Sequence, residues 1–167
     1  MKRHPRLTRA RLRELLRYDP QTGEFRWRKR PGARPGPLVG YVPRQQNGRC
    51  IRIDGRVYNE HQLAWLYMTG RWARPTIDHR DGDCTNNRWK NLRRATHSQN
   101  NANRRRPRHN TSGYKGVYPG RRPGQWRAQI GKNGRMHYLG TFPTRQAAHA
   151  AYVAAAQKHY GEFARAQ

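Results

Sequence analysis

Acidic residues are scarce in this sequence. Only nine Asp and Glu stand against 36 Lys and Arg in 167 residues, which gives a formal net charge of +27 and an isoelectric point of about 11.7. Solubility requires far less charge, so this balance favours a polyanionic partner, and nucleic acid above all. A basic surface that is simply hydrated is the alternative. A basic membrane-surface helix lacks support, because no long amphipathic segment is present.

Cysteine and long apolar runs are also nearly absent. Cys50 and Cys84 are far apart and outside any CxxC pair, so neither a disulfide framework nor a cysteine zinc site is indicated, and we expect reduced thiols in a cytosolic protein. No apolar stretch reaches membrane-spanning length, and no apolar signal segment follows the basic N-terminus, so we expect a soluble intracellular protein. A hydrophobic fraction of 34% favours two small domains over one large core.

The few carboxylates are unevenly placed. Asp78, Asp81 and Asp83, three of the nine, fall within six residues. Carboxylates in the middle of a phosphate-seeking surface would repel the ligand unless a cation lies between them, so the cluster points to a metal-assisted site on nucleic acid. For Asp81 and Asp83 we keep the structural interpretation, because Asp81-Gly82 is a common hairpin turn.

The residues from Thr76 to Asn103 have the pattern DH…DG…NN…NL…N, which resembles the phage-type branch of the HNH nucleases. The resemblance implies a hairpin and helix that grip one divalent metal ion, Mg²⁺ or Mn²⁺. It implies that Asp78 and Asn100 hold the metal, that His79 is the general base, and that Asn91 clamps the loop. One carboxylate and one amide oxygen also suit Mg²⁺ on chemical grounds, and a neutral imidazole can take a proton from water near pH 7.

The segment before this pattern also resembles the family. His61 opens the run HQLAWLYMTG, which resembles the first part of the phage HNH pattern. It either faces the site and touches phosphate or is a packed or capping histidine. Asn59 is expected to cap this helix, over residues 61–69, and Gly70 to end it. Further upstream we expect a helix over residues 7–18, a strand over 24–28 and a hairpin turn at Asp54-Gly55.

Arginines flank the expected metal site. Arg88, Arg93 and Arg94 are placed to hold the DNA backbone on either side of the scissile bond, although each is also explained by simple hydration.

The last third of the chain contains YKGVY, WRAQI, YLGTF and AAHAAY in an order that resembles the AP2 DNA-binding domain. Periodicity independently predicts three strands and a helix, with a hairpin turn at Asn133-Gly134. The resemblance implies that the outer face of the sheet enters the major groove, with contacts from Lys115, Tyr118, Arg121, Arg122, Arg127, Gln129 and Tyr138. Several family positions differ here, so the target sequence is not inherited. A sheet with hydrated arginines is the alternative.

We therefore predict an α+β protein: an HNH domain of the ββα-metal type over residues 1–104, a linker over 105–112, and an AP2-like domain over 113–167. The predicted function is a metal-dependent endonuclease of the phage or homing type. It would act on double-stranded DNA as a monomer with one divalent ion per chain and no obligate protein partner. The expected location is the cytoplasm of a bacterial host or phage-infected cell. Two alternatives remain: a DNA-binding regulator with a silent HNH unit, and an RNA- or ribosome-binding basic protein.

Overall fold

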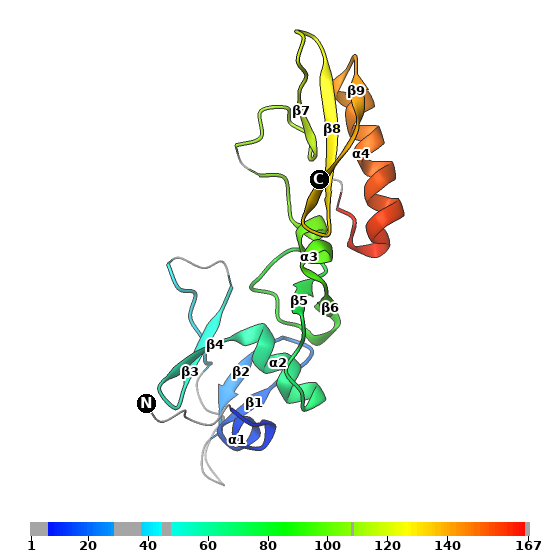
Figure 1. The fold of residues 1–167 in the computed structure, drawn as a ribbon. Coiled ribbons are helices and arrows are strands. Elements are labelled where there is room, and N and C mark those ends of the chain that lie inside the picture. The colour runs from blue at the N-terminus through cyan, green and yellow to red at the C-terminus, as the bar shows by residue number, and fades with distance from the viewer. Residues whose placement is uncertain (1–6, 29–37, 45–47, 108, 166–167) are drawn as a thin grey trace, which may run out of the picture. The chain divides into compact units, whose positions relative to one another are not determined.

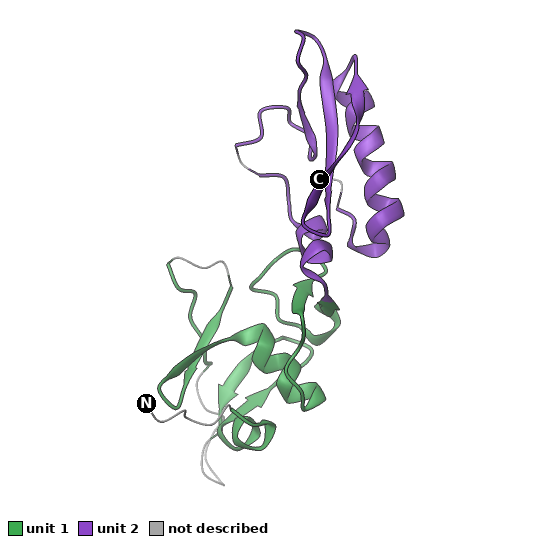
Figure 2. Cartoon of the chain, viewed as in Figure 1, with its two compact units in different colours: residues 1–94 green, residues 95–167 purple. Residues whose placement is uncertain are grey.

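The structure is a computed structural model that describes residues 7–28, 38–44, 48–107 and 109–165 (Figure 1). The chain forms two compact units, residues 1–94 and 95–167 (Figure 2). The described part contains four α-helices and small antiparallel sheets, which agrees with the predicted α+β class. None of its helices is long and apolar enough to cross a membrane. The predicted domain limits stay a prediction. The short helix over residues 97–103 belongs to the second compact unit.

The first unit begins with a helix that is shorter than predicted. Helix α1 covers Arg9–Leu15 and is capped by the Thr8 hydroxyl, which accepts a hydrogen bond from the Arg11 amide at 3.2 Å. The prediction of a helix to residue 18 was wrong because strand β1, Leu16–Tyr18, pairs instead with strand β2, Phe25–Trp27. This pairing buries three large apolar side chains, those of Leu16, Tyr18 and Phe25.

A hairpin and a helix follow. Strands β3, Cys50–Ile53, and β4, Arg56–Asn59, meet at the predicted Asp54-Gly55 turn, where both residues have positive φ. Helix α2, Glu60–Thr69, ends at the left-handed Gly70 as expected. Asn59 occupies the N-cap position but its side chain makes no capping bond, so that part of the prediction was wrong. Its Oδ1 lies 3.4 Å from the Cys50 thiol instead.

The loop of the predicted metal site lies between two short paired strands. Strand β5, Thr76–His79, pairs with strand β6, Leu92–Ala95, and a 3-10 helix, η1, Trp89–Asn91, precedes β6. An apolar core supports the described part of this unit. It includes Leu12, Leu16, Phe25, Ile51, Ile53, Leu63, Leu66, Ile77 and Leu92.

The second unit contains the three strands and the long helix predicted from periodicity. Its short first helix, α3, covers His97–Asn103. Strands β7, Val117–Pro119, β8, Trp126–Lys132, and β9, Arg135–Phe142, form an antiparallel sheet in that order. Helix α4, Arg145–Tyr160, is capped by Thr144 and is followed by a 3-10 turn, η2, Gly161–Phe163.

Helix α4 lies close to the sheet. Its Ala148 and Ala156 are buried, the former against Val117 and Ala128 and the latter beside Ile130. Small side chains let the helix and the sheet approach closely. The likeness to AP2 domains themselves stays a prediction.

Gly116 provides a test of this packing. It has a φ of 73°, and a Cβ there would overlap the ring of Tyr152 from α4, whereas Gly134 has a φ of 76° with nothing within 4 Å. Gly134→Ala should therefore cost only the left-handed backbone penalty, about 1–2 kcal/mol. Gly116→Ala should cost an additional 1–3 kcal/mol or so for overpacking. Urea unfolding followed by circular dichroism measures both, and equal losses would contradict the close approach of Gly116 and Tyr152.

Candidate active site

The loop over residues 80–91 joins β5 to β6 and is held by its own polar side chains. The Asp81 carboxylate accepts hydrogen bonds from the Asp83 amide at 2.9 Å and from the Asn86 side chain at 2.6 Å. The Asp83 carboxylate accepts from the amide and the hydroxyl of Thr85. Gly82 between them has a φ of 71°. Both aspartates thus have the turn-forming role that the sequence favoured.

Asn91 closes this loop, in the position where a clamp was expected. Its side-chain oxygen accepts from the Asp81 amide at 3.1 Å, and its side-chain nitrogen donates to the Asn86 carbonyl at 2.7 Å and to the Asp81 carboxylate at 3.0 Å. Its backbone carbonyl accepts from the Arg80 amide at 2.9 Å. Because one residue ties both ends of the loop, the chain leaves β5 and enters β6 in a defined geometry.

Asp78 lies on β5 and is buried. Its Oδ2 accepts a hydrogen bond from Arg93 Nε on β6 at 2.8 Å, and both side chains are less than a tenth exposed. Breaking such a pair from one side leaves an uncompensated buried charge, at a cost of about 3–5 kcal/mol. Arg93 therefore lies in the interior, and the predicted contact between Arg93 and the DNA backbone would require breaking its pair with Asp78.

His79 ends β5 and lies beside His61 from the first turn of α2. The two ring centroids are 5.2 Å apart and the rings are nearly perpendicular, at 84°. Burial, and secondly the neighbouring His79, lowers the pKa of His61 to about 4. His61 is therefore neutral near pH 7, and it packs against the predicted general base without supplying a positive charge for phosphate.

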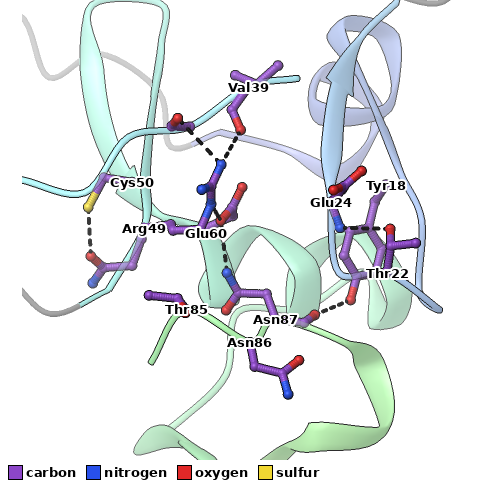
Figure 3. Close-up of polar contacts among 12 residues, drawn as sticks. Tyr18, Thr22, Glu24, Val39, Arg49, Cys50, Glu60, Thr85, Asn86 and Asn87 are labelled. Carbon is purple, nitrogen blue, oxygen red and sulfur yellow. Dashed lines mark hydrogen bonds and ion pairs between the residues drawn. The ribbon is translucent and has the colours of Figure 1, made fainter. Parts of the chain in front are cut away.

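A row of polar side chains lies behind His79. His79 Nε2 is 3.0 Å from Asn87 Oδ1, and Asn87 Nδ2 donates to Glu60 Oε2 at 2.9 Å. Arg49 Nε donates to the same Glu60 oxygen at 2.8 Å (Figure 3). Sequence reasoning gave no role to Glu60 or Arg49 and none to Asn87 beyond its place in the pattern. One signal was present: Glu60 is one of only nine acidic residues and directly precedes His61.

The second predicted metal ligand, Asn100, lies on α3 in the second unit. The helix begins with a capping box formed by Thr96 and Gln99, and the Asn100 amide donates to the Thr96 carbonyl at 3.0 Å. Each predicted ligand by itself has a hard oxygen donor of the kind that a small divalent cation prefers: a carboxylate in Asp78, which the Arg93 bond orients, and a side-chain amide in Asn100. Among the described residues, no group of three or more His, Cys, Asp or Glu could hold a metal ion.

The remaining predicted arginines of this region are exposed. Arg88 lies on the surface just before η1, and Arg94 on β6 donates twice to the Arg74 carbonyl, at 3.0 and 3.2 Å.

The sheet of the second unit presents most of its predicted DNA contacts to solvent. Tyr118 and Arg127 are paired across β7 and β8, with the guanidinium 5.7 Å from the ring centroid. Gln129 and Tyr138 are paired across β8 and β9. Arg121 and Arg122 are exposed in the loop between β7 and β8. These residues give one face of the sheet the mixture of cationic and aromatic groups that suits nucleic acid.

Lys115 differs from these residues. Its ammonium is buried and donates to the carbonyls of Ala102, Arg104 and Arg165 at 2.5, 2.6 and 3.2 Å. Burial lowers the pKa of Lys115 to about 8. The side chain therefore holds the end of α3, and the predicted contact with a DNA phosphate would require breaking three hydrogen bonds.

Residues 58–102 match the protein family described as HNH endonuclease. The match runs from the end of β4 through α2, β5 and β6 into α3, the elements that carry Asp78, His79 and the clamped loop. These residues form an HNH endonuclease domain, so that prediction is confirmed, and the domain indicates a nuclease of the HNH family. A comparison with curated proteins found no match. The AP2-like and phage-type assignments lie outside this finding and stay predictions.

The low pKa of His61 predicts a pH dependence of stability. The pKa of His61 is about 4 in the folded chain and 6.5 ordinarily. Between these pH values the imidazole is therefore protonated in the unfolded chain and neutral in the folded chain. The contribution of the neutral His61 to the free energy of unfolding is complete above pH 6.5 and is lost as the pH falls toward 4. Urea unfolding at pH 7 and pH 4.5 should show the loss, and it should shrink in His61→Phe.

His109→Ala removes an exposed histidine and is the matched control for this measurement. It should keep the full pH dependence of the native chain. An unchanged pH dependence in His61→Phe would show that other groups cause it.

Proposed function

We propose that this protein is a metal-dependent endonuclease that hydrolyses phosphodiester bonds of double-stranded DNA and leaves 5′-phosphate and 3′-hydroxyl ends. The observation that carries the proposal is the pair Asp78-His79 at the end of β5, within the matched HNH segment. Asp78 and Asn100 would hold one Mg²⁺ or Mn²⁺. When bound, such an ion stabilises charge on the scissile phosphate and on the leaving oxygen.

His79 acts as the general base in this proposal. A neutral imidazole within hydrogen-bond distance of a water molecule takes its proton as the water attacks phosphorus. Asn91 keeps the loop closed, Arg93 orients Asp78, and Arg88 and Arg94 provide positive charge for the DNA backbone. One metal site per chain favours a nick unless two chains meet on the DNA.

The second unit supplies much of the DNA affinity in this proposal. The exposed face with Tyr118, Arg127, Gln129 and Tyr138, together with the loop arginines Arg121 and Arg122, would lie in the major groove. The biological setting we propose is a phage-encoded or mobile nuclease of the homing type, acting in the bacterial cytoplasm as a monomer.

A DNA-binding regulator with a silent HNH unit is the second candidate. It is favoured by the ion pair between Asp78 and Arg93, since a carboxylate neutralised by a buried guanidinium attracts a cation less strongly.

Plasmid cleavage separates the two candidates. Supercoiled DNA should be nicked with Mg²⁺ or Mn²⁺ and left intact with EDTA. His79→Ala should lower the rate about 10²–10⁴-fold, the usual contribution of general acid–base catalysis. Asp78→Asn should also lose activity, because it removes the charged ligand of the metal and leaves the buried Arg93 without its counter-charge. His109→Ala is the matched histidine control and should cut normally. A chain that binds duplex DNA tightly yet never cuts with any divalent ion supports the regulator instead.

Salt-dependent binding tests the role of the second unit. Each phosphate contact contributes about 0.9 to the slope of log affinity against log salt concentration. Arg121→Ala or Arg122→Ala should therefore reduce the slope for a fluorescent DNA duplex by about one. Lys158→Ala on α4 is the control and should leave the slope unchanged. The major groove of an A-form RNA duplex is too narrow for a sheet, so the proposed binding mode requires DNA. Tighter binding to an RNA duplex than to the DNA duplex would therefore favour the RNA-binding alternative.

A further inference from the structure

The side chains behind His79 form a continuous row, which we call the relay: Arg49, Glu60 and Asn87. Arg49 precedes β3, Glu60 starts α2, and Asn87 lies in the loop between β5 and β6. Glu60 and Asn87 are almost completely buried, at 1% and 2% exposure. Figure 3 shows the Asn87 amide pointing toward Glu60 and the Arg49 guanidinium approaching the same carboxylate from the other side.

The direction of each hydrogen bond in the relay follows from the residue at its far end, Arg49. A guanidinium can only donate, so Glu60 Oε2 is an acceptor for Arg49. The Asn87 atom that contacts this oxygen must also donate, and it is therefore the NH₂ group. The amide oxygen of Asn87 is left on the side of His79. The Glu60 carboxylate thus determines which way the Asn87 amide is oriented, and Arg49 favours the ionised form of that carboxylate.

This orientation determines the tautomer of His79. An amide oxygen only accepts hydrogen bonds, so the imidazole nitrogen 3.0 Å away, Nε2, must carry a hydrogen. A neutral imidazole has one N–H, so Nδ1 is the basic nitrogen. A histidine that takes a proton from water needs one nitrogen in this state and aimed at the substrate.

Asn87 is in turn held by the N-terminal part of the unit. Its carbonyl accepts a hydrogen bond from the buried Tyr18 hydroxyl at 2.6 Å. The amide of Trp89 donates to the Pro20 carbonyl at 3.0 Å. A Cβ on Gly23, which has a φ of 79°, would overlap the backbone of Asn87 and Arg88. The turn after β1 therefore packs directly on the loop that carries Asn87.

We propose that Arg49, Glu60 and Asn87 are positioning residues that hold His79 as its Nε2–H tautomer, and that the β1–β2 turn keeps Asn87 in place. Three of these supporting parts, Arg49, Tyr18 and the turn, lie outside the matched segment 58–102. The tautomer itself is a property of the folded chain. Its catalytic importance rests on the proposed nuclease function.

The two hydrogen-bond partners of Glu60 favour its ionised form, which is the form that accepts hydrogen bonds. Burial raises the pKa of Glu60, and Arg49 and Asn87 oppose that shift. Its other oxygen, Oε1, is buried with no hydrogen-bond partner in the part of the chain that the structure describes. A buried carboxylate with one unsatisfied oxygen is unfavourable for stability, and such groups often have a functional reason.

The tautomer can be measured without any activity. Long-range ¹H–¹⁵N correlation spectra of the uniformly ¹⁵N-labelled full chain distinguish the two tautomers of each histidine. The signals of His79 are identified by their absence in His79→Gln, and spectra are recorded above the ordinary imidazole pKa of about 6.5, with and without Mg²⁺. The native chain should show His79 as Nε2–H. The Nδ1–H form, or an equal mixture, would overturn the proposal.

Variants then test whether the relay is the cause. Asn87→Ala and Glu60→Ala should each convert His79 to a mixture of tautomers, because the amide oxygen is removed or free to rotate away. Glu60→Gln is the matched control: its amide oxygen can still accept from Arg49 and Asn87, so the Nε2–H form should persist. If the Nε2–H form also persists in both alanine variants, the relay does not set the tautomer.

Cleavage kinetics provide a separate result. Asn87→Ala should lower kcat about 10–100-fold with little change in KM, the usual effect of losing a partner that orients a site residue, and Glu60→Gln should retain activity. Ile51→Val, which loosens the same core, should leave kcat unchanged. An equal loss of kcat in Ile51→Val would indicate a merely structural role. If the native chain never cuts DNA but the spectra follow the expected pattern, the nuclease function fails and the positioning role stands.

Discussion

Buried carboxylates in the first unit require arginine partners, and these pairs determine how the site is built. Asp78 is paired with Arg93 across β5 and β6, and Glu60 is paired with Arg49 between α2 and the residue before β3. An unpaired buried charge is too costly to retain, so each carboxylate is tied to a second element. One pair includes Asp78 itself, and the other reaches His79 through Asn87. Two of the nine acidic residues therefore lie in the interior, each held in a defined position by its arginine.

Asn87 connects these parts. It contacts His79 and Glu60 through its side chain and Tyr18 through its backbone carbonyl, so a strand, a helix and the N-terminal segment meet at one residue. This explains why the N-terminal elements belong to the same compact unit although the family match begins only at residue 58. A short hairpin and helix bury little apolar surface by themselves, and the core around Leu12, Phe25 and Leu63 supplies the support.

The local patterns of the sequence were reliable where the chain makes its own hydrogen bonds. The turns at Asp54-Gly55 and Asn133-Gly134 and the end of α2 at Gly70 all depend on the conformational preferences of residues adjacent in sequence. The predictions that were wrong concern residues whose partners are distant. The apolar spacing of residues 7–18 fits a helix, but Leu16–Tyr18 pairs with β2 and buries its apolar side chains there. Asn59 contacts the Cys50 thiol and does not cap its own helix.

The sequence by itself determined the class of the site. The order Asp78, His79, Asn91 and Asn100 identified an HNH unit, and the charge of +27 indicated nucleic acid, because both depend only on which residues are present and in what order. Only the tertiary structure decided which charged groups are available. Arg93 and Lys115 are as basic in the sequence as Arg88 and Arg127, but the fold places the first two in the interior with oxygen partners. Likewise Arg49 and Asn87 are 38 residues apart along the chain, and both meet Glu60 because its buried carboxylate needs hydrogen-bond donors that only the fold brings near.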